Sequence, residues 1–75
     1  MRKQMYEVIF EATETLQNGK ERRVRKGILM DCVNPVTNRH TSPEQQIARG
    51  EAALKEAYFY NIVYIETKKK TLIFG

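Results

Sequence analysis

The sequence predicts a single small α+β domain, residues 1–75, in which an antiparallel sheet carries one helix packed on one face. Three observations support this fold class. An alternating segment ending at Asn18-Gly19 indicates a hairpin, a later segment has helical spacing behind a capping signal, and a β-branched segment follows the helix. In chain order the predicted elements are two strands, a helix and two more strands (ββαββ).

Period-two alternation over residues 5–15, MYEVIFEATET, predicts the first strand. Its apolar face consists of Tyr6, Val8, Phe10 and Ala12. Asn18-Gly19 follows and is typical of a two-residue type I′ turn, because both central residues of that turn need positive φ. We therefore predict a hairpin in which residues 5–16 pair with residues 21–33.

A two-residue turn fixes the register of this hairpin by setting Gln17 opposite Lys20. The predicted register then forms two pairs of opposite charge, Glu14 with Arg23 and Glu11 with Lys26. It also forms three further cross-strand pairs: Ile9 with Ile28, Val8 with Leu29, and Phe10 with Gly27. Pairs of these kinds contribute roughly 0.2–1 kcal/mol each, so they favour this register over a one-residue slip.

Residues 41–59, TSPEQQIARGEAALKEAYF, give the clearest helix signal in the chain. Ser42 is a good N-cap, Pro43 suits the first helical position, and Gln45 stands where a capping box needs it. The apolar face of the helix is predicted to consist of Ile47, Gly50, Leu54, Ala57 and Tyr58. Gly50 predicts a close approach to the sheet. In the predicted core Tyr6, Val8, Phe10 and Leu29 meet Ile47, Leu54 and Tyr58.

The segments around the helix are predicted from composition. Residues 34–41, NPVTNRHT, indicate a loop, because Asn34 precedes a proline. Residues 61–67, NIVYIET, are β-branched and aromatic, which favours a third strand. Lys68 to Lys70 are predicted to end the third strand and to separate it from a short fourth strand at residues 71–74. The pattern leaves open whether these two strands lie beside the hairpin or exchange with a second chain.

Composition limits the classes of function. The chain has 75 residues, a net charge of +4 and one cysteine, Cys32. One cysteine and one histidine (His40) supply neither a disulfide nor the four ligands of a structural zinc, so we expect no metal and no cofactor. We find no signal peptide and no apolar run near the roughly 20 residues of a membrane span. We therefore expect a cytoplasmic protein without a membrane segment.

Catalytic signals are weak. Cys32 and His40 are eight residues apart, and no orienting acid or oxyanion hole stands at a known spacing from them. The chain has no P-loop and no Gly-rich dinucleotide turn. Arg39 and His40 precede the helix N-terminus, where an anion can bind, but a polar loop facing water is the favoured interpretation. We expect no enzymatic activity and no small-molecule substrate.

The first functional hypothesis is a protein interface. Under the predicted register, apolar side chains remain on the sheet face away from the helix: Ile9, Val24, Ile28, Met30 and Tyr64. An uncovered apolar patch is typical of an interface, and the alternative is that loop 34–41 or the N-terminus covers it. We predict a non-catalytic binding, adaptor or inhibitor-type module that docks on another protein or forms a homodimer. Its small size and basic balance are typical of accessory proteins of phages and mobile elements.

The second hypothesis is DNA or RNA binding. Basic residues cluster on the predicted hairpin and after the third strand: Lys20, Arg22, Arg23, Arg25, Lys26, Lys68, Lys69 and Lys70. Such a ridge suits a phosphate backbone. Neighbouring carboxylates, including Glu11, Glu14 and Glu21, neutralise half of it under the predicted register, and the chain carries no known nucleic-acid-binding motif. Nucleic acid is therefore the alternative partner.

Overall fold

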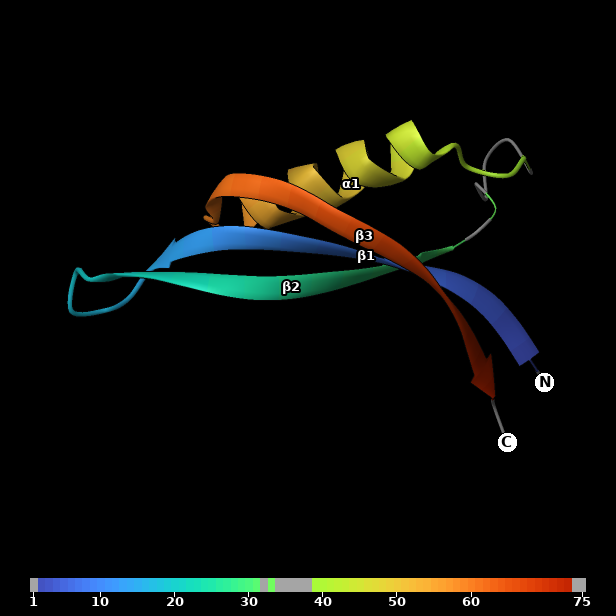
Figure 1. Cartoon of the computed structure of the whole chain (residues 1–75), viewed down its shortest axis with the longest axis horizontal. Helices are drawn as coiled ribbons and strands as arrows, with labels where there is room; N and C mark the ends of the chain where they lie inside the picture. The colour runs from blue at the N-terminus through green and yellow to red at the C-terminus, as the bar shows by residue number, and fades with distance from the viewer. Residues whose placement is uncertain (1, 32, 34–38, 74–75) are drawn as a thin grey trace.

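The computed structural model describes residues 2–31, 33 and 39–73 and shows a three-stranded antiparallel sheet with one helix on one face (Figure 1). The elements are β1 (Arg2–Thr15), β2 (Glu21–Asp31), α1 (Pro43–Glu56) and β3 (Tyr60–Ile73). The strand order is β2-β1-β3, so β1 is the central strand. The α+β class and the single helix are confirmed, whereas the ββαββ order is wrong because the described chain is ββαβ.

The predicted third and fourth strands form one continuous strand, β3. Lys68 to Lys70 lie inside β3 and pair with Glu7, Tyr6 and Met5 of β1, so they do not break the strand. This segment has no Gly, Asn or Pro to make a tight turn, and an edge strand tolerates lysines because their side chains remain in water. β3 pairs with β1 of the same chain, and Phe74 lies outside the described residues.

β3 is irregular in its first half and regular in its second. Its pairing with β1 shifts at two places, between Ile9 and Phe10 and between Glu11 and Thr13. From Glu66 to Ile73 the register is unbroken. Irregularities of this kind increase the local twist of a strand, and β3 coils across the sheet in Figure 1.

The hairpin forms, but its register differs by one residue from the predicted one. The Leu16 N–H donates to the carbonyl of Lys20 (2.7 Å) and the Gly19 N–H to the carbonyl of Leu16 (2.9 Å), so the loop has three residues. Asn18 Oδ1 accepts from the Lys20 N–H (3.0 Å), and Gly19 has a φ of 83°. A three-residue loop closed by a left-handed glycine is a common alternative to the two-residue turn. The observed pairs include Ile9 with Gly27, Val8 with Ile28 and Phe10 with Lys26.

This shift moves most apolar side chains of β2 to the helix face of the sheet. Directly opposed residues of an antiparallel pair share a face, and three of the four apolar residues of β2 oppose the helix-facing residues of β1. These pairs are Val24 with Ala12, Ile28 with Val8 and Met30 with Tyr6. The prediction that Val24, Ile28 and Met30 lie on the uncovered face is therefore wrong. Leu29 lies on that face instead and is 49% exposed.

The core lies between β1 and α1. Val8 and Phe10 are fully buried and Leu54 nearly so. Partly buried residues pack around them: Ile28, Met30, Ile47, Phe59 and Ile62. The predicted close approach at Gly50 is confirmed, because a Cβ there would overlap the Phe10 ring. The predicted core positions of Leu29 and Tyr58 are wrong, since both side chains are exposed.

The shifted register makes opposite predictions for two neighbouring residues of β2. Ile28→Asp is expected to lower the free energy of unfolding by about 2 kcal/mol or more, because it places a carboxylate against the core. Leu29→Asp is expected to cost about 1 kcal/mol or less, because its side chain faces water. Urea denaturation of both variants checks the register, and a larger loss for Leu29→Asp would contradict it.

Candidate functional site

The sheet face opposite α1, named here the open face, is charged. Four ion pairs lie on it: Lys3 with Asp31 (2.7 Å), Lys68 with Glu66 (3.4 Å), Lys70 with Glu7 (3.5 Å) and Arg25 with Glu11 (4.0 Å). Ile9, on the central strand of this face, is only 7% exposed between Gly27 and Glu66. Leu29 on β2 and Val63 on β3 lie at the two edges of the same face and are about half exposed. The Glu7 carboxylate lies directly over Gly27. A solvated layer of ion pairs therefore covers the face for which an apolar interface was predicted.

The five residues of the predicted interface do not share one surface. Ile9 lies on the open face, whereas Val24, Ile28 and Met30 are partly buried on the helix face. Tyr64 also lies on the helix side, where its ring meets the Phe10 ring edge-on with centroids 5.9 Å apart. Of the five, Tyr64 is the most exposed, at 38%.

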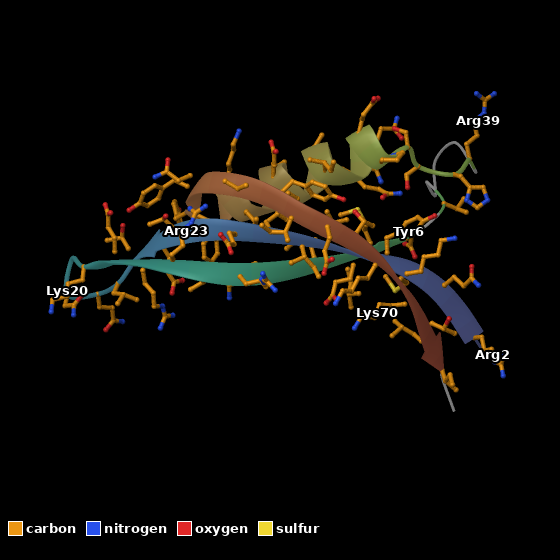
Figure 2. All side chains as sticks on the ribbon, in the orientation of Figure 1. Arg2, Tyr6, Lys20, Arg23, Arg39 and Lys70 are labelled. Atoms are coloured by element: carbon orange, nitrogen blue, oxygen red, sulfur yellow. The ribbon has the colours of Figure 1, made fainter. Side chains whose placement is uncertain are left out.

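Most of the predicted nucleic-acid-contact residues have partners inside the chain. Arg22 pairs with Glu14, and Arg25, Lys68 and Lys70 belong to the ion pairs of the open face. Lys26 lies over the Phe59 ring, 5.4 Å from its centroid. Lys20 lies at the hairpin end and Lys70 towards the other end of the sheet, so these residues do not form one continuous ridge (Figure 2).

Arg23 joins all three strands. Its Nη1 donates to Thr13 Oγ1 of β1 (2.9 Å) and to the carbonyl of Asn61 in β3, and its Nη2 donates to the carbonyl of Glu11 (3.5 Å). The guanidinium thus fixes the start of β3 against the hairpin. Local sequence patterns missed this role because it depends on the strand order.

Because Arg23 donates hydrogen bonds to both β1 and β3, we predict that its loss destabilises the fold more than the loss of the adjacent Arg22. Arg23→Ala is expected to lower the free energy of unfolding by about 1–2 kcal/mol, because three donated hydrogen bonds are lost. Arg22→Ala is the matched control and is expected to cost roughly 0.5 kcal/mol, the value of an exposed ion pair. Urea denaturation measures both, and equal losses would show that Arg23 does not hold the strands together.

The exposed apolar side chains concentrate on β3. Among the described residues, six large hydrophobic side chains are exposed: Leu29, Tyr58, Val63, Tyr64, Ile65 and Ile73. Four of these belong to β3, and Tyr58 stands two residues before it. β3 is also an edge strand, so one side of its backbone pairs with no other strand of the described sheet. We name this surface the β3 edge. It consists of the unpaired backbone side of β3 together with the exposed side chains of Tyr58, Val63, Tyr64, Ile65 and Ile73.

Tyr58 occupies a position where glycine is usual. The Tyr58 N–H donates to the carbonyl of Lys55 and the Phe59 N–H to that of Leu54, both at 3.0 Å, which is the Schellman pattern of a helix end. The residue at this position adopts a left-handed conformation, and Tyr58 has a φ of 66°. Its side chain is 88% exposed. A non-glycine residue in this conformation costs on the order of 1 kcal/mol, and the exposed ring offsets none of it through core packing.

Tyr60, the first residue of β3, contacts the hairpin rather than contributing to the exposed apolar surface. Its hydroxyl lies 3.4 Å from Thr15 Oγ1. The contact with Thr15 acts to lower the pKa of the Tyr60 hydroxyl, but the neighbouring Glu21 carboxylate, partial loss of solvation and the negative charge of Glu21 together outweigh this and raise the pKa above its usual value.

The start of α1 is used by the chain itself. Ser42 Oγ accepts from the Gln45 N–H (3.2 Å), and the Ser42 N–H donates to Gln45 Oε1 (3.4 Å), so the predicted capping box is confirmed. Arg39 and His40 are exposed, and His40 forms an isolated bridge with Val33. Cys32 and most of the predicted loop, residues 34–38, lie outside the described residues.

Within residues 2–31, 33 and 39–73, no three His, Cys, Asp or Glu side chains come close enough to hold a metal ion. No helix in this described part has the length and apolar character needed to cross a membrane. Comparison with protein-family models, curated proteins and solved structures gives no significant match to this chain.

Proposed function

We propose that this protein is a non-catalytic docking module of the cytoplasm that binds another protein, or a second copy of itself, through the β3 edge. The observation that carries the proposal is the concentration of exposed apolar side chains on one edge strand. Val63, Tyr64 and Ile65 are consecutive, and each is at least 37% exposed. Apolar surface gathered in this way on a small domain is typical of a protein interface.

The surface area of the chain supports the proposal. The structure exposes 5750 Å², whereas a compact monomer of this mass exposes about 4,800 Å². Its radius of gyration is 14.1 Å, against roughly 11 Å for a compact domain of this length. The excess area of about 1,000 Å² is close to the ~800 Å² that each partner buries in a standard interface.

An edge strand offers two kinds of contact to a protein partner. The free backbone groups of β3 can pair with an added strand, which supplies affinity through main-chain hydrogen bonds. Tyr58 and Tyr64 supply rings that bury a large area while keeping a hydroxyl for polar contacts. The Tyr64 hydroxyl lies 2.7 Å from Thr67 Oγ1, which holds its ring in one orientation.

DNA or RNA binding is the weaker proposal. Arg22, Arg25, Lys68 and Lys70 pair with carboxylates. Arg23 donates to oxygens of β1 and β3. Cations that are already paired gain less from a phosphate, because the partner carboxylate repels it. Nucleic-acid binding is kept as an outcome of the experiment below.

Two exposed residues on opposite edges of the sheet provide a matched test of docking. Val63 is 51% exposed on β3 and Leu29 is 49% exposed on β2. Val63→Asp is expected to weaken association at least tenfold, because it places a charge in the apolar contact, whereas Leu29→Asp is expected to leave association unchanged. The measurement is native mass together with tagged capture from lysate, half of which is treated with nuclease.

Circular dichroism first establishes that both variants remain folded. Association that both variants retain would contradict docking through the β3 edge. If nuclease treatment removes all the proteins captured from the lysate, the result would favour the nucleic-acid alternative.

Tyr58 predicts opposite changes in stability and binding. Tyr58→Gly is expected to raise the free energy of unfolding by about 1 kcal/mol, because glycine adopts the left-handed conformation without strain. The same change is expected to weaken association about tenfold, because it removes an exposed aromatic anchor. Thermal denaturation and native mass measure the two effects on one sample. A variant that is more stable and associates normally would exclude Tyr58 from the interface.

A further inference from the structure

We propose that the occupant of the β3 edge is a second copy of this chain, with the two β3 strands paired antiparallel about a two-fold axis at Thr67. The inference rests on the proposed docking function and names its partner. It follows from the order of charges along the regular half of β3, from the small core of the single chain and from the area that the chain leaves exposed.

The charges beside Thr67 complement themselves under a two-fold axis. Glu66 and Lys68 both point to the open face, where they already form an ion pair of 3.4 Å within the chain. Antiparallel pairing centred on Thr67 sets Glu66 opposite the partner's Lys68 and Lys68 opposite the partner's Glu66. Four alternating charges then lie together, and opposite charges on directly opposed residues stabilise a strand pair.

The neighbouring registers are disfavoured by like charges. Moving the axis by one residue places Glu66 opposite the partner's Glu66, or Lys68 opposite the partner's Lys68. Moving it to Lys69 sets Lys69 opposite the partner's Lys69 and Lys68 opposite the partner's Lys70. Like charges directly opposed destabilise a strand pair. The register centred on Lys68 also sets Glu66 opposite the partner's Lys70, but its two central lysines face each other. The Thr67 register is favoured because it has opposite charges on both sides of the axis and no pair of like charges.

The single chain has a small core that a second copy would extend. Among the described residues, Val8 and Phe10 are the only fully buried large side chains, and the single cysteine cannot form an internal disulfide. Domains of this size usually need a further source of stability, and oligomerisation is a common one. The proposed pairing gives a continuous six-stranded sheet. A two-fold axis perpendicular to the sheet places both helices on the same side of it.

The exposed apolar residues lie beside this axis. Val63, Tyr64 and Ile65 precede Glu66, so in the pair they meet the Lys69-to-Ile73 half of the partner's strand. The lysine side chains there have long apolar stems that can cover the exposed rings and branched side chains. The irregular half of each β3 therefore packs against the regular half of the other.

The first experiment is sedimentation equilibrium of the full chain at concentrations up to about 1 mM, where even a dimer with a Kd of ~1 mM is populated. The expected result is a dimer of twice 8.8 kDa that Val63→Asp weakens at least tenfold. A chain that stays monomeric throughout this range would overturn the inference.

The second experiment identifies the register by exchanging charges. Glu66→Lys and Lys68→Glu each break the pair within the chain and set like charges across the axis, so each variant alone is expected to dimerise at least tenfold more weakly. Mixed together they place opposite charges across the axis on both sides. A heterodimer at least tenfold tighter than either variant alone, measured by native mass spectrometry, is expected. Its absence would overturn the pairing at Thr67.

These results separate the two proposals. If the wild type is monomeric but captures a protein partner that the Val63→Asp variant does not capture, the second copy is overturned as the occupant. The proposed docking function through the β3 edge then still holds. A dimer that Val63→Asp does not weaken uses another surface and overturns both proposals.

Discussion

The contact between Phe10 and Gly50 holds the two layers of this protein together. The Phe10 ring is fully buried beneath α1, and the missing side chain of Gly50 provides the space for it. The same ring meets Tyr64 edge-on, so one side chain joins the central strand, the helix and β3. In a chain with so few buried side chains, the loss of this contact would affect every element. The position of the exposed β3 surface relative to the helix depends on it.

Local chemistry made part of the fold predictable. The capping box at Ser42 and Gln45 involves residues three apart, so the start of α1 follows from sequence alone. The hairpin was also predictable, but its register was not, because Asn18-Gly19 suits loops of two or three residues. Cross-strand charges did not discriminate, since Glu14 finds an arginine at either position 22 or 23. The better signal for the register was the alternation of apolar residues in β2. Val24, Ile28 and Met30 are separated by even numbers of residues, so they point to one face of the sheet, which is the apolar face of β1.

The candidate site was less predictable, because it depends on the strand order. Three consecutive lysines suggested a break, yet β3 runs through them since β1 offers a partner along its whole length. Helical spacing of apolar residues continues to Tyr58, but the helix ends at Glu56 and leaves that ring exposed. Nothing in the local pattern of residues 60–73 indicates an edge position. The exposed apolar surface appears only when β1 is known to lie between the other two strands.

The central position of β1 also has a kinetic consequence. Its pairing with β2 closes a loop of three residues, and hairpins of this kind form in roughly 1–10 μs. Its pairing with β3 joins Arg2 to Ile73, the most distant partners in the chain, and such long-range contacts slow folding. Until β3 arrives, one backbone edge of β1 is bare beside Val8, Ile9 and Phe10. The partly folded chain therefore passes through a stage at which the strand that supplies most of its core is open to aggregation, and late β3 docking closes it.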